Sequence, residues 1–244
     1  MSKTAVLIPA RWASTRFPGK PLHLIAGKPL VQHVWERANR AKGVERVIVA
    51  TDDMRIAEAA FAFGAEVALT SPRCVSGTDR CAEVARRLRG FRQVVNVQGD
   101  EPLVDPALVS RLAETLDADR SLDMATAATP FAEGEDPANP NAVKVVLDRA
   151  GNALYFSRSL LPFPRDGGAF KWLRHLGIYA YTTRFLLRFV EWPTGRLEKI
   201  ESLEQLRALE NGATIRVLKT RSASVGVDTP ADVALAERLL QRKR

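Results

Sequence analysis

The sequence predicts an α/β protein with a mostly parallel sheet, and three observations support this prediction. In the first half, short apolar runs alternate with helix-like segments whose apolar residues recur at helical spacing. Polar or glycine-containing turns directly follow several of the runs, as at the carboxyl ends of buried strands. After about residue 120 the alternation stops, and strand-like runs follow one another. We therefore expect one domain over residues 1–244, Rossmann-like, with an inserted mixed or antiparallel lobe at about 124–196.

The expected elements of the first half alternate regularly. Gly64 favours the end of a helix, because glycine readily adopts the left-handed conformation. Pro106 favours the start of one, since the first helical turn tolerates its missing N–H. We expect strands at 4–8, 46–50, 65–69 and 93–97, and helices at 30–41, 54–63, 78–89 and from 106 onward. Such an order predicts right-handed crossovers between parallel strands.

The second half contains more consecutive strands. Strand patterns occur at 124–130, 143–147, 153–158, 176–181 and 214–219, and helix patterns at 197–211 and 231–242. Consecutive strands without intervening helices are typical of an insertion at the edge of a parallel sheet.

Composition limits the classes of function. The 244 residues carry a formal net charge of +8, with ordinary hydrophobic and charged fractions of 46% and 26%. The cations are spread along the chain and no nucleic-acid motif is present, so we expect no nucleic-acid partner. No apolar run approaches a membrane span and no secretion signal is evident, so we expect a cytoplasmic protein without a membrane partner. Cys74 and Cys81 fit no metal or disulfide pattern and are expected to be free thiols.

A cationic loop follows the first predicted strand. Arg11, Arg16 and Lys20 lie within it, with Ser14 and Thr15 between them. Cations and backbone N–H groups on a loop bent by proline and glycine suit a polyphosphate. The loop matches neither common phosphate-binding fingerprint, and a plain basic surface loop is the alternative.

Two aspartates and one turn are further candidates for a ligand site. Asp100 follows the fourth strand and Asp228 precedes the last helix, and a parallel sheet could bring both to one edge to share Mg²⁺. The alternatives are a turn aspartate at 100 and a helix cap at 228. The turn at 76–80 could hold an anion or a nucleobase edge, or Ser76 or Thr78 could simply cap the helix.

The motif Ile-Pro-Ala-Arg-x-x-Ser-Thr-Arg-x-Pro-Gly-Lys-Pro-Leu at residues 8–22 resembles the signature of the CMP-Kdo synthetases, the 3-deoxy-manno-octulosonate cytidylyltransferases of lipopolysaccharide synthesis. The similarity continues, in order, through residues 50–53, 76–80, 96–102, 139–146, 153–158, 174–179, 204–207 and 226–230. It covers nearly the whole chain. One departure is the segment 162–172, which is shorter than the corresponding loop of some relatives.

The resemblance implies a nucleotidyltransferase fold and a nucleotide site. Arg11 and Lys20 would hold the triphosphate of CTP. Asp100 and Asp228 would ligate Mg²⁺, and these four residues would be the catalytic ones. The other residues implied at the nucleotide are Ala10, Ser14, Thr15 and Arg16 around the phosphates, and Ser76 and Arg80 near the cytosine.

The resemblance also implies a site for a sugar acid, 3-deoxy-D-manno-octulosonate (Kdo). Its residues would be Gln98, Arg158, His175, Tyr179, Glu201 and Gln205. Glu201 and Gln205 are four residues apart in a predicted helix and would share one face. As alternatives, His175 and Tyr179 could be ordinary half-buried strand residues, and Glu201 could be solvated.

The implied reaction is attack of the anomeric hydroxyl of Kdo on the α-phosphorus of CTP, with release of pyrophosphate. Positioning and charge neutralisation would carry it without a covalent nucleophile. A CMP-sialate or 8-amino-Kdo type of synthetase is the rival interpretation. Relatives are homodimers, and by analogy we expect a homodimer.

Overall fold

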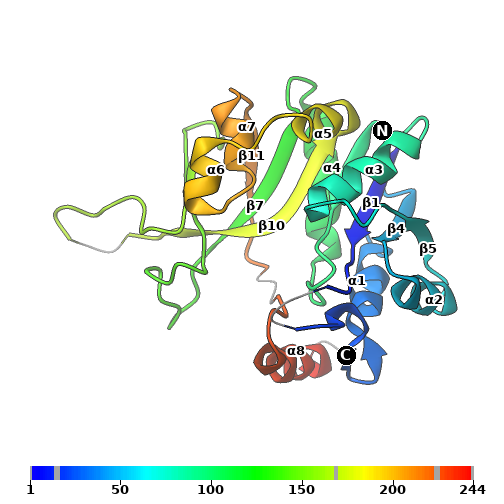
Figure 1. The fold of residues 1–244 in the computed structure, drawn as a ribbon. Helices are drawn as coiled ribbons and strands as arrows, with labels where there is room; N and C mark the ends of the chain where they lie inside the picture. The colour runs from blue at the N-terminus through cyan, green and yellow to red at the C-terminus, as the bar shows by residue number, and fades with distance from the viewer. Residues whose placement is uncertain (1, 14–16, 168–169, 223–225, 243–244) are drawn as a thin grey trace.

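The computed structural model describes residues 2–13, 17–167, 170–222 and 226–242. Its centre is a nine-stranded sheet, of which seven strands form the main row (Figure 1). The order in this row is β11 (Ile215–Lys219), β7 (Met124–Pro130), β10 (Leu173–Thr182), β6 (Gln93–Asn96), β1 (Thr4–Pro9), β4 (Arg46–Thr51) and β5 (Glu66–Leu69). Within this row β10 runs antiparallel to both neighbours, and the remaining pairs are parallel. The predicted, mostly parallel sheet is confirmed.

Helices cover both faces of the sheet, which explains why β1 reads as a continuous apolar run. Val6 and Ile8 point to one face, and Ala5 and Leu7 to the other; all four are fully buried. The first face packs against α1 (Leu30–Ala38), α2 (Met54–Ala62) and α4 (Pro106–Ala118). The second packs against α3 (Gly77–Arg87), α5 (Thr183–Phe189) and α7 (Leu206–Glu210).

Side-chain caps fix the start of four of these helices. Asp53, Ser76, Asp105 and Thr182 each accept a hydrogen bond from a backbone N–H two or three residues further on, at the starts of α2, α3, α4 and α5 respectively. These caps satisfy N–H groups that have no partner inside the helix. The predicted alternative that Ser76 is a cap is therefore correct.

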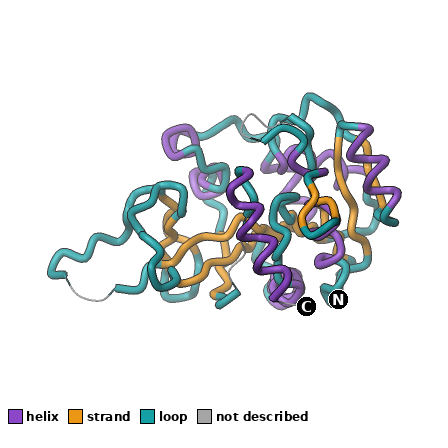
Figure 2. Tube along the Cα trace, turned by 90° about the horizontal axis from the view of Figure 1, so that it is seen from below, coloured by secondary structure: helices purple, strands orange, loops and turns teal. Residues whose placement is uncertain are grey.

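The lobe differs in part from the prediction. β7 and β10 lie inside the main row, and only β8 (Lys144–Leu147) and β9 (Ala153–Ser157) lie off it. The reason is the length of β10: its second half pairs with β6, whereas its first half extends beyond β6 and meets β8 at Arg174. The described residues between β9 and β10, 158–167 and 170–172, project away from the remaining fold (Figures 1 and 2).

The helix expected at 197–211 is instead two short helices, α6 (Arg196–Glu201) and α7. Ser202 ends α6 in the left-handed conformation, with φ of 51°. Glu201 and Gln205 therefore do not share one helix face, and that prediction was wrong. A left-handed serine is uncommon, so residue spacing alone gave no sign of the break.

Short elements near the N-terminus were not predicted. They are η1 (Lys20–Leu22), β2 (Leu24–Ile25) and β3 (Lys28–Pro29). The last helix, α8 (Pro230–Arg242), packs beside them, below the sheet in Figure 1. Ile25, Leu30, Val227 and Ala236 form a small buried cluster there. This cluster ties the chain just before Asp228 to the N-terminal loop region.

Two expectations about the whole chain can be compared with the structure. In the parts that the structure describes, no helix has both the length and the apolar character needed to cross a bilayer. Cys74 and Cys81 are free thiols, as predicted.

Candidate active site

A cleft of 420 Å³ lies at the carboxyl edge of the sheet, between the ends of β1 and β6 and the start of α3. Parallel strands place their following loops at this edge, so residues far apart in the sequence meet here. The sequence-predicted residues that line it are Ala10, Arg11, Lys20, Ser76, Arg80, Gln98, Asp100 and Asp228. Ser14, Thr15 and Arg16 lie outside the described residues.

Close backbone packing forms the floor of this first cleft. A Cβ atom on Gly99 would lie 2.7 Å from the carbonyl oxygen of Pro9, a distance that real Cβ atoms do not adopt. A Cβ on Gly77 would lie 3.1 Å from Cγ of Pro9. The loops after β1 and β6 and the start of α3 are therefore in contact, and glycine at 99 is required for it.

Lys20 lies between the two predicted metal-binding aspartates. Its Nζ atom donates to Oδ2 of Asp100 at 2.6 Å and to Oδ1 of Asp228 at 3.4 Å. The sheet thus brings both carboxylates to one point, as expected. The loop at residues 8–22 contains no carboxylate, and Lys20 pairs instead with two carboxylates from distant segments of the chain.

The donor set at this point fits a divalent cation. Two carboxylates, Asp100 and Asp228, face the Lys20 ammonium at this point, and carboxylate oxygens are ligands that a divalent cation takes. Mg²⁺ takes few protein carboxylates and completes its shell with water and substrate phosphates. Across the described residues, no cluster of three or more His, Cys, Asp and Glu side chains is found, so the protein would supply only part of such a shell.

The start of α3 forms one wall of the cleft. Ser76 and Asp79 make a reciprocal capping box, in which each side chain accepts from the other's backbone N–H. Arg80 is 3% exposed, donates to the Thr70 hydroxyl and pairs with Asp52 at 3.2 Å. The guanidinium is thus held in place at the cleft surface before any ligand arrives.

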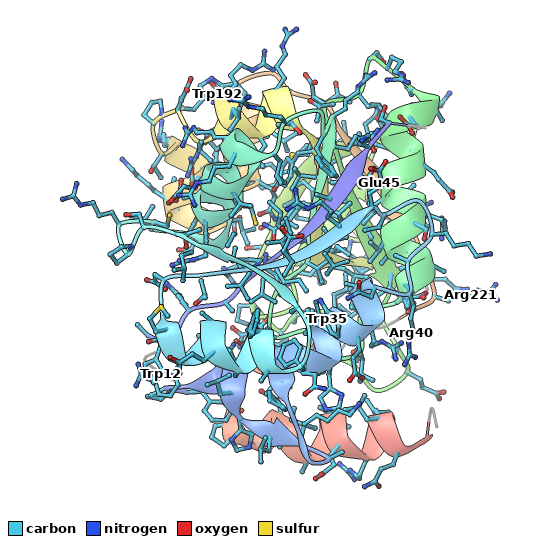
Figure 3. The ribbon with its side chains drawn as sticks, turned by 90° about the vertical axis from the view of Figure 1, so that its right-hand side faces the viewer. Trp12, Trp35, Arg40, Glu45, Trp192 and Arg221 are labelled. Carbon is cyan, nitrogen blue, oxygen red and sulfur yellow. The ribbon has the colours of Figure 1, made fainter. Side chains whose placement is uncertain are left out.

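The N-terminal loop is anchored next to the cleft. The guanidinium of Arg55, on α2, lies 3.5 Å from the centre of the Trp12 ring, and Trp12 is labelled in Figure 3. The Gly19 N–H donates to the Trp12 carbonyl at 3.2 Å, and Gly19 has a left-handed φ of 71°. These contacts hold the loop at Trp12 and Gly19, on either side of residues 14–16. Arg11 is exposed at the cleft.

A second, wider cleft of 740 Å³ adjoins the first. The two share Val75, Ser76, Gly77 and Gln98 in their walls. Arg158 and Tyr179, both predicted for the sugar acid, line the second cleft. Gln98 therefore lies where a ligand of one cleft would meet a ligand of the other.

Arg158 is held by carbonyl groups. Its guanidinium donates to the backbone oxygens of Glu201, Pro140 and Ser202 at 2.7, 3.0 and 3.3 Å. Among the residues that the structure describes, its guanidinium forms no ion pair with a carboxylate. A fixed, unneutralised cation at a cleft wall suits an anionic ligand.

Glu201 supports Arg158 and is not a cleft-lining residue. Its carboxylate accepts from the Ser157 hydroxyl at 2.5 Å and from the Arg158 N–H at 2.9 Å. It holds the backbone of Arg158 while its own carbonyl holds the guanidinium.

His175 and Gln205 also lie behind the cleft walls. The Nε2 atom of His175 is 2.9 Å from the hydroxyl of Thr126, and its ring meets Phe156 edge-on. Burial lowers the pKa of His175 from 6.5 to about 3, so the imidazole is neutral at ordinary pH. Gln205 is 4% exposed at the start of α7. Neither side chain lines either cleft, although both were predicted for the sugar acid.

Glu204 was missed as a candidate residue. It lines the second cleft and accepts a hydrogen bond from the Thr78 hydroxyl, and burial raises its pKa. Both residues belong to segments of the resemblance, but their pairing spans 126 positions. No local pattern could have revealed it.

A mostly parallel sheet with a cationic cleft and paired carboxylates at its carboxyl edge defines a nucleotide-binding α/β protein. Comparisons with known proteins identify the family within this class. The cytidylyltransferase family model matches residues 5–215. The 3-deoxy-manno-octulosonate cytidylyltransferase of Syntrophobacter fumaroxidans is 54% identical over 93% of this chain and 92% of its own. That of an Anaeromyxobacter species is 52% identical over 98% of both chains.

The solved structure of a CMP:2-keto-3-deoxy-manno-octonic acid synthetase complexed with CTP matches the full length of both chains, with a TM-score of 0.95 and 42% identity. The chain belongs to the cytidylyltransferase family and, within it, to the 3-deoxy-manno-octulosonate cytidylyltransferases, the CMP-Kdo synthetases.

Proposed function

We propose that this protein activates Kdo with CTP to give CMP-Kdo and pyrophosphate for lipopolysaccharide biosynthesis. One observation carries the proposal: a cationic cleft with paired carboxylates meets, at Ser76, Gly77 and Gln98, a second cleft that presents an arginine whose guanidinium pairs with no carboxylate among the described residues. Joining a nucleotide to a sugar acid needs two such sites whose reacting ends meet.

The first cleft would bind CTP. Arg11 and Lys20 would neutralise the triphosphate, and Ser76, at the start of α3, would lie near the cytosine. Arg80, fixed by Asp52 and Thr70, would lie near the cytosine. Ser14, Thr15 and Arg16 would complete the phosphate loop, with the Ala10 backbone beside it.

The second cleft would bind Kdo. Arg158 would receive the carboxylate of the sugar acid, and Tyr179 would contact the sugar ring. The Gln98 amide group donates to the Asn96 side chain at 3.1 Å, which fixes its orientation at the junction of the clefts. We assign His175, Glu201 and Gln205 to the support of this wall rather than to direct contact.

Asp100 and Asp228 would hold Mg²⁺. When bound, this ion would neutralise phosphate charge and favour ionisation of a hydroxyl group in its shell. Lys20 would then exchange part of its contact with the two carboxylates for contact with the triphosphate.

The residues of this chain would promote the reaction by positioning the two substrates and by neutralising the charge of the phosphates. They would align the anomeric hydroxyl of Kdo with the α-phosphorus of CTP, while Arg11 and Lys20 stabilise the departing pyrophosphate. Cys74 lines the first cleft, but burial and a hydrogen bond to Glu83 raise the pKa of its thiol to about 11. It is therefore protonated at ordinary pH and is a poor candidate for a nucleophile.

We also propose a cytoplasmic homodimer. Leu154, Phe163 and Phe170 on the lobe are 62%, 79% and 45% exposed, and exposed apolar side chains of this size favour contact with a second copy. Sedimentation of the wild type and of a Phe163→Ser variant tests this: a dimer weakened by the substitution supports it. A wild-type monomer would exclude it.

Pyrophosphate release with each of the four ribonucleoside triphosphates, and with Kdo, 8-amino-Kdo and sialate, tests the activity. We expect release with CTP and Kdo at the highest kcat/KM. A higher kcat/KM with sialate or 8-amino-Kdo would favour the rival CMP-sugar-acid synthetase, and no release with CTP would refute the proposal.

A further inference from the structure

Lys144 on β8 is a fully buried lysine, with 0% of its surface exposed. Its Nζ atom donates to the carbonyl of Asn139 at 3.1 Å and to the carbonyl of Arg158. Within the described part of the chain, no carboxylate lies within ion-pair distance of this ammonium. Burying a charge without a counter-ion is costly, so a role for this lysine calls for explanation.

Both acceptors belong to the segments that hold Arg158. One is the carbonyl of Arg158 itself, and the other belongs to Asn139, next to Pro140, whose carbonyl accepts from Nη1 of Arg158 at 3.0 Å. The Lys144 ammonium therefore links the backbone of Arg158 to the segment whose carbonyl group accepts from the Arg158 guanidinium. Glu201 holds the opposite side through the Arg158 N–H and Nε.

The charges around Lys144 are consistent with this placement. Burial lowers the pKa of Lys144; the charges of Glu201 and Asp136 oppose that change, and the Arg158 cation adds to it. The β8–β9 pairing, with Lys144 opposite Ser157, brings the two cations to the same place. Lys144 thus lies behind the wall that, in the proposed function, receives a carboxylate at Arg158.

We propose that Lys144 is a positioning residue for the acidic substrate: it fixes Arg158 in the second cleft and does not touch the substrate itself. This inference rests on the proposed function. It assigns a task to a residue that lines neither cleft, and it distinguishes that task from a general contribution to the fold.

Steady-state kinetics of Lys144→Met test the proposal, because methionine keeps the length of the side chain and removes its charge. We expect the KM for Kdo to rise about tenfold or more, the loss expected for hydrogen bonds from a charged group, with the KM for CTP unchanged. Lys171→Met, at an exposed position of the same lobe, is the matched control and should leave both values unchanged. Lys144→Gln is assayed alongside and tests the same claim if the Met variant does not fold.

A double-mutant cycle decides whether Lys144 acts through Arg158. In an Arg158→Ala background, Lys144→Met should add less than about twofold to the KM for Kdo, because the guanidinium that Lys144 positions is gone even though the carbonyl that accepts from Lys144 remains. Equal changes in both KM values, an unchanged KM for Kdo, or full additivity with Arg158→Ala would overturn the proposal. Failure of the proposed function would instead be seen in the wild type, as an absence of turnover with Kdo and CTP.

Discussion

The two clefts are built in different ways. The walls of the first are loop backbones at strand ends, pressed together at Gly99 and Gly77, and its predicted residues that are described all line it. The second depends on side chains that support one another: Gln98, Arg158 and Tyr179 line it, whereas His175, Glu201 and Gln205 lie behind them. The order of the parallel strands therefore brings the motifs of the first cleft together, whereas contacts between supporting side chains assemble the second.

The largest expected effect is at the carboxylates of the first cleft. Asp100→Asn and Asp228→Asn keep the shape of the side chain and remove a negative charge from the proposed Mg²⁺ site. Each should lower kcat by orders of magnitude while the protein stays folded. The losses should be far from additive, since either change disables the same ion.

Melting curves and a Mg²⁺ titration of activity measure this outcome. A helix cap is the alternative for Asp228, but the Asp232 carboxylate accepts from the N–H groups of Asp228 and Thr229, so the start of α8 already has a cap. A fully active Asp228→Asn variant with an unchanged Mg²⁺ requirement would show that Asp228 binds no metal.

A smaller effect should separate the backbone-built cleft from the side-chain-built one. Gly99→Ala places a methyl group against the Pro9 carbonyl and should cost about 1–3 kcal/mol of unfolding free energy, as overpacking does. Gly177→Ala is the matched control, because Gly177 lines the second cleft, has no left-handed φ, and would place a Cβ with no neighbouring atom within 4 Å. Denaturant unfolding of both variants compares them; equal stability would contradict the close packing of the first cleft.

The smallest effect concerns pH and His175, which is half-buried. Its folded pKa of about 3 lies below its ordinary value of 6.5, so between these values the unfolded chain binds the proton and the native state does not. Its contribution to stability is present above pH 6.5 and is lost as the pH falls toward 3. His175→Gln, which keeps a donor for Thr126, should melt with a weaker dependence on pH between 7 and 5. An identical slope for both proteins would show that the native state does not hold His175 in its neutral form.

The sequence was sufficient for the sheet and for the residues of the first cleft. Apolar runs ending in glycine and proline turns mark strand ends, and parallel strands share an edge, so Lys20, Asp100 and Asp228 could be expected to meet. The sequence did not predict the division into α6 and α7, because Ser202 adopts the left-handed conformation within an otherwise helical pattern. Nor could it show that Glu201 binds the Arg158 backbone or that Thr78 binds Glu204, because such pairs depend on tertiary structure.

Paired kinetics of Lys20→Ala and Arg158→Ala test whether the first cleft binds CTP and the second binds Kdo. Lys20→Ala should weaken the use of CTP, at about 2–4 kcal/mol in kcat/KM, for losing a charged contact at a desolvated site. Arg158→Ala should instead raise the KM for Kdo far more than that for CTP. We expect this pattern, in which each variant mainly impairs a different substrate. If each variant impairs both substrates to the same extent, the division between the clefts is wrong.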